Sequence, residues 1–179
     1  MYWDSELSNM NNSISSRRRI ADMLAKNQNY LEATINLILK PEHENSLNAF
    51  KALEVLSRDH IALLLPFSDK IIISGKLLQQ PAVKRCFLKI IEQLLLVHYS
   101  EDSYFMTKEQ GEDIIQLCFT WLISDKQIAT QVFSMQNLFL LKNEKNWIEE
   151  ELKHIILNNY ASSSAGYQAR ARKILRKIK

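Results

Sequence analysis

The sequence predicts an all-α protein whose helices stack as an α-solenoid of about four helical hairpins. Only 3 Gly and 3 Pro occur in 179 residues, so the turn residues that β-hairpins require are scarce. A helical signature, in which basic or small residues and an amphipathic run follow an apolar residue, occurs four times. The apolar residues that open it lie 36, 45 and 39 residues apart, at Leu47, Val83, Ile128 and Tyr167. This period is the length of one helical hairpin, and stacked hairpins form a solenoid.

The N-terminal half is divided into helices by amphipathic spacing and by prolines. Residues 1–14 are polar and are expected to form a partly ordered N-terminal arm with Trp3 and Leu7 as anchors, while a single repeat domain is expected over 15–179. Ser15 and Ser16 are expected to cap the first helix of that domain. Pro66 should interrupt the helical region between 60 and 78. The helices expected on either side run over about 15–26, 30–39, 45–58 and 81–98, and Pro81 is the first residue of the last of them. The first of these helices is expected to cap the N-terminal end of the repeat array.

The C-terminal half starts with a loop over 99–107, in which Tyr104 and Phe105 are expected to face inward. Thr107 and Gln110 have the spacing of a capping box, which marks the start of the next helix. Three further helices are expected, which end near Leu141, near Asn159 and at the C-terminus, with Ser124-Asp125 and Asn146 as caps and a break at 162–164.

Large apolar residues at helical spacing are expected to form the core. These residues are Phe50, Leu53, Phe87, Ile90, Leu94, Trp121, Phe133, Leu138, Trp147 and Ile155. Cys86 and Cys118 also lie in apolar helical patterns rather than in a spaced cysteine framework. We therefore expect both to be buried free thiols in a reducing cytoplasm, with a disulfide as the less favoured alternative.

The sequence contains no pattern typical of a catalytic, cofactor or metal site. The four histidines form no His-x-x-x-His pair, and the three glycines stand apart, so neither a zinc helix nor a phosphate-binding loop is predicted. Glu151 and His154 have the spacing of half a di-iron motif, but no second copy occurs. The acidic clusters at 109–113 and 149–151 lie in the first turns of expected helices, where the helix dipole favours negative charge, although acid–base work or a partner site is the alternative.

The four signature helices, paired with the helices before them, resemble the second helices of HEAT-like (armadillo-type) repeats. Pro81-Ala82-Val83-Lys84-Arg85 is similar to the repeat consensus, and Asp125-Lys126-Gln127-Ile128 supplies the aspartate of its internal turn. The resemblance covers about residues 28–179. It implies a right-handed solenoid with an N-terminal capping helix, in which the second helices line the concave side.

A second resemblance concerns the C-terminal end. The run from Tyr160 to Lys173 is similar to small bacterial helical proteins, some of which carry the label adenylosuccinate lyase. In those lyases a serine-rich catalytic loop continues into a Met-Pro-x-Lys-x-Asn run. Ser162-Ser163-Ser164-Ala165-Gly166 has no such continuation, so the motifs do not support lyase activity.

Charge is divided unevenly between the helices, although the net charge is only +3. The first expected helix and the four signature helices hold 17 basic and 3 acidic residues, whereas the rest of the chain holds 6 basic and 17 acidic residues. This division predicts a basic concave groove that could steer an anionic partner; the alternative is ordinary capping of the ends of the array. The candidate partner- or anion-binding residues are Arg17, Arg18, Lys84, Arg85, Lys89, Lys126, Arg170 and Arg172.

The expected function is that of a non-enzymatic interaction module or scaffold, without cofactor, that binds an unidentified protein or peptide through the basic groove. Nucleic-acid binding is the alternative, because HEAT-like alkylpurine DNA glycosylases show that this architecture supports it. No apolar run is long enough to span a bilayer and no signal peptide is evident, so a cytoplasmic protein without membrane contact is expected.

Overall fold

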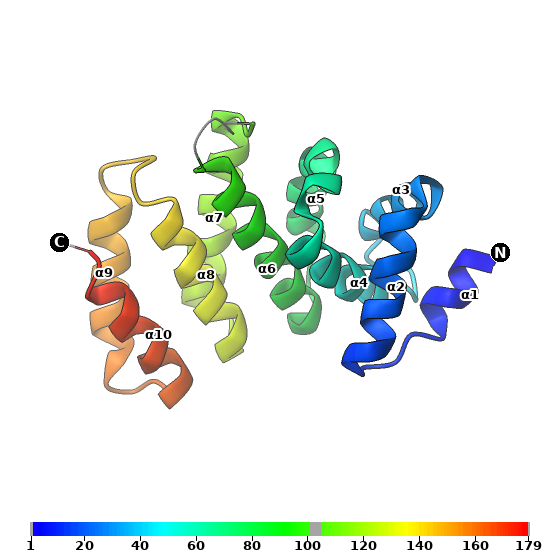
Figure 1. Ribbon diagram of the computed structural model, residues 1–179. Coiled ribbons are helices and arrows are strands. Elements are labelled where there is room, and N and C mark those ends of the chain that lie inside the picture. The colour runs from blue at the N-terminus through cyan, green and yellow to red at the C-terminus, as the bar shows by residue number, and fades with distance from the viewer. Residues whose placement is uncertain (1, 101–104, 179) are drawn as a thin grey trace. The chain divides into compact units, whose positions relative to one another are not determined.

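The structure is a computed structural model that describes residues 2–100 and 105–178 (Figure 1). These residues form α-helices and short 3₁₀ turns and contain no strand. The chain divides into two compact units, Met1–Leu94 and Leu95–Lys179. The α-helices are α1 (Tyr2–Ser8), α2 (Ile14–Lys26), α3 (Gln28–Ile38), α4 (Ser46–Asp59), α5 (Ser68–Ser74), α6 (Pro81–His98), α7 (Lys108–Ser124), α8 (Ile128–Leu140), α9 (Ile148–Tyr160) and α10 (Ala165–Leu175).

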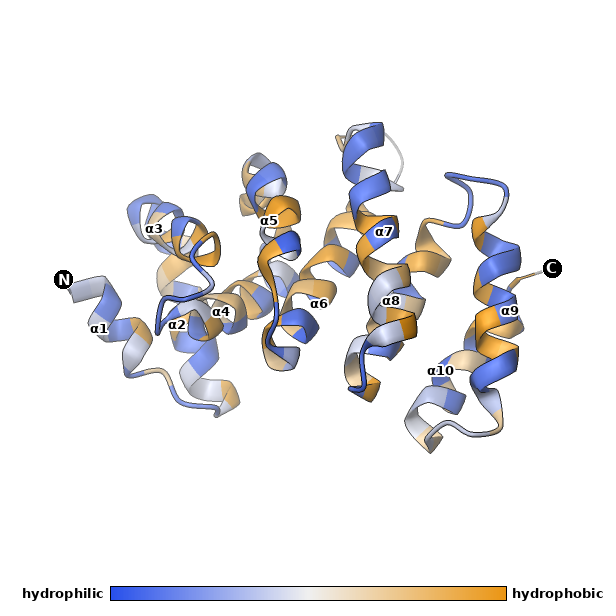
Figure 2. Ribbon diagram, turned by 180° about the vertical axis from the view of Figure 1, so that it is seen from behind, coloured by the Kyte–Doolittle hydropathy of each residue, from blue (hydrophilic) through white to orange (hydrophobic). Residues whose placement is uncertain are grey.

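The N-terminal unit is organised around α4, which contacts α1, α2 and α3. Almost every residue from Ala49 to Ser57 is buried, because neighbouring helices cover more than one face of α4. Figure 2 shows hydrophobic residues along α4 and the adjoining part of α6. As the sequence predicts, α6 begins at Pro81, and Pro66 lies in a 3₁₀ turn that separates α4 from α5.

The segment expected to be a partly ordered arm contains a helix, α1, that was not predicted from the sequence. Its two expected anchors, Trp3 and Leu7, are buried. The Trp3 indole N–H donates to Thr34 Oγ1 at 3.0 Å, and its ring stacks on Tyr30 at a centroid distance of 4.6 Å. These contacts attach α1 to α3.

The C-terminal unit consists of the hairpins α7–α8 and α9–α10. Helix α8 contacts α7, α9 and α10, and so lies at the centre of this unit. The capping box predicted for α7 is present, since Gln110 N–H donates to Thr107 Oγ1 at 3.3 Å and Thr107 N–H donates to Gln110 Oε1 at 2.8 Å. The hairpin order of both units agrees with the predicted solenoid class.

Three of the expected caps are wrong. Ser13, rather than Ser15 or Ser16, accepts the hydrogen bond at the start of α2. Helices α8 and α9 begin at Ile128 and Ile148, and their N-cap residues, Gln127 and Trp147, form no side-chain cap hydrogen bond. In each case the observed N-cap lies one to three residues from the expected one, because amphipathic spacing does not fix helix ends to the residue.

Eight of the ten expected core residues are buried, and two are not. Phe133 is half-buried. Trp147 was expected in the core, but half of it (50%) is exposed. Its position explains the difference: Trp147 precedes the first turn of α9 and therefore does not follow the buried face of that helix, where Ile148, Leu152, Ile155 and Ile156 lie.

The loop that precedes α7 is described only from residue 105 onward, so the expectation for Tyr104 lies outside the described residues. Phe105 is half-buried, and its ring packs edge-on against the His98 ring at a centroid distance of 5.4 Å. The backbone N–H groups of Phe105 and Met106 both donate to His98 Nδ1, each at 3.2 Å. His98 thereby connects the end of α6 to the segment before α7.

Candidate functional site

The N-terminal unit contains a positively charged pocket between α2, α4 and α6. Its volume is about 270 Å³. Five cations and two carboxylates line it, which leaves a formal charge of +3. We call it the basic pocket, and its residues are Ile14, Arg17, Arg18, Glu54, Val55, Arg58, Asp59, Arg85 and Lys89.

Glu54 is the centre of the basic pocket. It lies on α4 between the buried residues Leu53 and Val55, and only 2% of it is exposed. A carboxylate removed from water in this way is costly unless cations and hydrogen bonds replace its hydration. The residues around Glu54 must therefore supply that compensation.

Three cations compensate the charge of Glu54, and they lie on three different helices. Lys89 Nζ of α6 donates to Glu54 Oε1. Arg58 Nη2, one turn further along α4, lies 3.1 Å from the same oxygen. Arg17 Nη1 of α2 lies 3.9 Å from Oε2. One buried carboxylate thus holds cations of α2, α4 and α6 around a single point.

The Arg17 side chain is held in the pocket but is not fully satisfied. About a fifth of it (21%) is exposed. Its Nε is buried and has no hydrogen-bond partner in the structure. Because a buried N–H without a partner carries a desolvation cost, Arg17 retains hydrogen-bonding capacity that an anionic group could use.

Arg18 and Arg85 lie at the mouth of the pocket. Both are exposed, and neither forms an ion pair with Glu54 in the described part of the chain. An exposed guanidinium has five donors in a planar fork, which matches carboxylate or phosphate oxygens. The pocket therefore combines a fixed inner cluster with two accessible arginines.

The structure brings four of the eight candidate residues together. Arg17, Arg18, Arg85 and Lys89 all line the basic pocket. Lys84 is also on α6 and is half-buried, but it does not line the pocket.

The other three candidates belong to the C-terminal unit, and two of them have partners there. Arg170 Nη1 donates to Gln136 Oε1 at 2.7 Å, and Arg172 Nη1 donates to the Tyr160 hydroxyl at 3.0 Å. Lys126 is exposed in the turn before α8. Their role in binding stays a prediction.

Glu54 and Arg58 were not predicted as members of this site. Glu54 is one of the three acidic residues on helices whose charge is otherwise basic. A signal was present, because Glu54 interrupts an otherwise apolar segment of α4 and Arg58 follows four residues later, on the same helical face. The sequence could not show that Arg17 and Lys89, 37 and 35 residues away, meet the same carboxylate.

The thiols are not activated. Cys86 and Cys118 are buried and free, as predicted. Burial raises the pKa of the Cys86 thiol, with the Glu54 carboxylate as a second cause, and burial raises the pKa of the Cys118 thiol strongly. Both thiols are therefore protonated near neutral pH, whereas a nucleophilic cysteine requires the thiolate. Among the residues that the structure describes, no three His, Cys, Asp or Glu side chains converge as a metal-binding group.

The order of helical hairpins places the protein in the class of α-helical repeat proteins. The HEAT repeat domain family matches residues 3–178. The chain therefore belongs to the HEAT repeat domain family. Neither curated proteins nor solved structures show a significant match to it.

Membership of this family indicates a general type of function. HEAT repeats typically mediate protein interactions, and the family is generally non-enzymatic. Within residues 2–100 and 105–178, no helix combines the length and the apolar character that crossing a membrane requires.

Proposed function

We propose that the protein is a non-enzymatic interaction module whose basic pocket binds an acidic segment of a partner protein. The observation that carries this proposal is the convergence of five cations on one pocket, organised by the buried carboxylate of Glu54. The family adds support, because HEAT repeats typically mediate protein interactions.

The inner cluster consists of Arg17, Arg58 and Lys89 around Glu54. It favours binding because these side chains are already ordered before a ligand enters. Arg17 and Lys89 are already held by Glu54, so little side-chain entropy remains to be lost when a ligand enters. Arg18 and Arg85 at the mouth can then form charge-assisted hydrogen bonds to an incoming carboxylate. The inner cations supply the positive potential, and the outer arginines supply the contacts.

A partner carboxylate fits this pocket better than a nucleic-acid backbone does. The volume of about 270 Å³ is suited to one side-chain group. A phosphate backbone needs a series of spaced cations, and the carboxylates of Glu54 and Asp59 would repel phosphates passing close to them. Nucleic-acid binding is therefore the second candidate and serves as an outcome of the test.

The test measures fluorescence anisotropy of three labelled probes: octaglutamate, octalysine and a short DNA duplex. We expect the full chain to bind octaglutamate and not octalysine. The double variant Arg18→Gln/Arg85→Gln should lower the affinity for octaglutamate by about tenfold or more, since two charge-assisted contacts are lost.

The matched control is Lys26→Gln/Lys40→Gln, which removes the same charge from exposed positions of the same unit outside the pocket. If both double variants lose the same affinity for octaglutamate, the effect depends on net charge alone, and the proposal is contradicted. Tighter binding of duplex DNA than of octaglutamate, with an affinity that falls steeply as salt rises, would favour the nucleic-acid function instead.

A further inference from the structure

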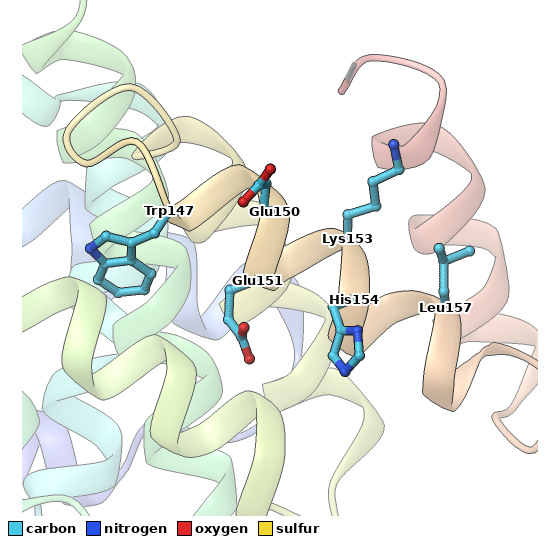
Figure 3. A pocket seen from close by; sticks show the side chains of 6 residues that line it. All are labelled: Trp147, Glu150, Glu151, Lys153, His154 and Leu157. Atoms are coloured by element: carbon cyan, nitrogen blue, oxygen red, sulfur yellow. The ribbon is translucent and has the colours of Figure 1, made fainter.

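A second surface, in the C-terminal unit, carries an exposed aromatic residue. Half of Trp147 is exposed, whereas Trp3 and Trp121 are buried. Two depressions of about 590 and 550 Å³ adjoin it, and Trp147 and Glu151 line both. Figure 3 shows the Trp147 ring beside the start of α9, with Glu151 and His154 extending from the following turns. We call this surface the Trp147 groove, and its main residues are Ile115, Phe119, Ile123, Trp147, Glu151 and Leu157.

The floor of the groove is apolar and partly fixed. The Trp147 ring lies 5.4 Å from the Phe119 ring of α7, so the indole is supported on one side and open on the other. Ile123 (66% exposed) and Leu157 (55% exposed) extend the apolar surface on α7 and α9. A supported aromatic residue next to exposed aliphatic residues is the composition of a binding hot spot rather than of an ordinary exposed helix face.

The rim of the groove is acidic and only partly neutralised. Lys145 pairs with Glu112 at 2.5 Å, and Lys142 pairs with Glu149 at 2.9 Å. Glu150 and Glu151 are exposed and form no ion pair within the described residues. Two lysines line the groove: Lys145, which is engaged with Glu112, and Lys153, which lies on α9 near Glu150 and Glu151. The lining still holds three carboxylates against these two lysines, and Glu150 and Glu151 can accept a cation of a partner.

We propose that the Trp147 groove binds a basic, amphipathic segment of a partner protein. A Lys or Arg side chain of that segment lies over the open face of Trp147 and pairs with Glu151 or Glu150, combining a cation–π contact with an ion pair. An apolar side chain one helical turn away fills the depression between Phe119 and Ile123. The choice of a basic occupant follows from charge complementarity, since carboxylates outnumber lysines three to two in the lining of the groove. An acidic segment would face Glu150 and Glu151, which are exposed and form no ion pair within the described residues.

The proposal does not depend on the function of the basic pocket, which is lined entirely by residues of the N-terminal unit. The probe is a synthetic amphipathic peptide of alternating Leu-Leu and Lys-Lys pairs, with a Glu-for-Lys version as its charge control. Binding is followed by tryptophan fluorescence, which reports on Trp147 because the other two tryptophans are buried, and by anisotropy of a labelled peptide.

We expect the lysine peptide to bind at least tenfold more tightly than the glutamate peptide. Trp147→Ala should lower its affinity about tenfold and Glu151→Gln about threefold. The matched controls are Leu96→Ala, an exposed apolar residue of the same unit, and Glu109→Gln, a first-turn carboxylate of α7 outside the groove.

Three outcomes would overturn the proposal. The first is equal binding of the two peptides, and the second is an equal loss in the groove variants and their controls. The third is a concentration-dependent dimer in sedimentation that Trp147→Ala abolishes, since the occupant would then be a second copy of this chain. Circular dichroism of each variant separates loss of binding from loss of folding.

Discussion

The basic pocket and the Trp147 groove both carry charge next to apolar residues, but they differ in where the charge lies. In the basic pocket the central group, Glu54, is 2% exposed and belongs to the most buried helix of its unit. In the Trp147 groove the carboxylates of Glu150 and Glu151 are exposed, and the aromatic residue lies outside the core.

This difference predicts different relations between binding and stability. A buried charge is tolerated only while its partners are in place, so changes at Glu54 affect the fold as well as the pocket. Exposed groups contribute little to folding, so changes in the groove should affect binding and leave stability nearly unchanged.

Two substitutions share the largest expected effect, and the first tests whether the helix that carries Arg85 and Lys89 is anchored in the core. Arg85 and Lys89 of α6 line the basic pocket, while Phe87 on the opposite side of the helix is fully buried. Phe87→Ala should lower the free energy of unfolding by about 3–5 kcal/mol, because the missing ring leaves a cavity. Urea denaturation measures it, with the exposed Leu96→Ala on the same helix as control. An unchanged midpoint for Phe87→Ala would contradict the assignment of this side of α6 to the core.

The next effect concerns Glu54 itself. Glu54→Gln keeps the shape of the side chain but removes the charge that Lys89, Arg58 and Arg17 share. We expect a loss of about 2–3 kcal/mol in the free energy of unfolding, because hydrogen bonds to charged groups are lost and an amide N–H₂ faces cations. Glu150→Gln is the matched change in the Trp147 groove and should shift the unfolding midpoint very little. Equal shifts for the two variants would remove the distinction between the two surfaces.

The helices were largely predictable from the sequence, but the details of both surfaces were not. Pro81 and the Thr107–Gln110 capping box are local signals, and both α6 and α7 begin where these signals place them. Glu54 could not be assigned in the same way, because its burial depends on partners from α2 and α6 that are distant in sequence. Trp147 was wrongly predicted to lie in the core. Helical spacing assigns a face only to residues inside a helix, and Trp147 lies at the N-terminal boundary of α9.

Tryptophan substitutions in the C-terminal unit compare a core site with the groove directly. Trp121→Ala should cost about 3–5 kcal/mol, since 95% of this residue is removed from solvent in α7. Trp147→Ala should cost less than about 1 kcal/mol, because half of the ring is exposed before the substitution. Thermal denaturation followed at a wavelength dominated by helix signal measures both. A large destabilisation by Trp147→Ala would identify Trp147 as structural and weaken its role as a binding anchor.

A pH effect is expected in the C-terminal unit from His98. Burial lowers the pKa of this imidazole, against the smaller opposite effect of Glu144. The unfolded chain therefore binds a proton at His98 more readily than the folded chain, so the stabilising contribution of the neutral ring is complete above about pH 6.5 and is lost as pH falls towards the lower folded pKa. Urea denaturation at pH 7.5 and 5.5 should show a decrease in stability that is smaller in His98→Gln than in the exposed-site control His154→Gln. Identical decreases in these two variants would contradict the lowered pKa.

The smallest expected effect separates two exposed arginines of the basic pocket. Arg58 contacts Glu54 at 3.1 Å although its side chain is 52% exposed, whereas Arg85 has no such contact. Arg58→Gln should therefore cost about 0.5–1 kcal/mol and Arg85→Gln less than about 0.5 kcal/mol. Urea denaturation at low salt and in 1 M NaCl provides the measurement, because salt screens an exposed pair strongly and a buried one weakly. If the difference disappears at high salt, Arg58 acts as a surface partner of Glu54, and Lys89 and Arg17 supply most of the compensation for the buried carboxylate. If Arg85→Gln is the more destabilising of the two, Arg85 is part of the inner cluster, and the division of the pocket into a fixed interior and an accessible mouth is wrong.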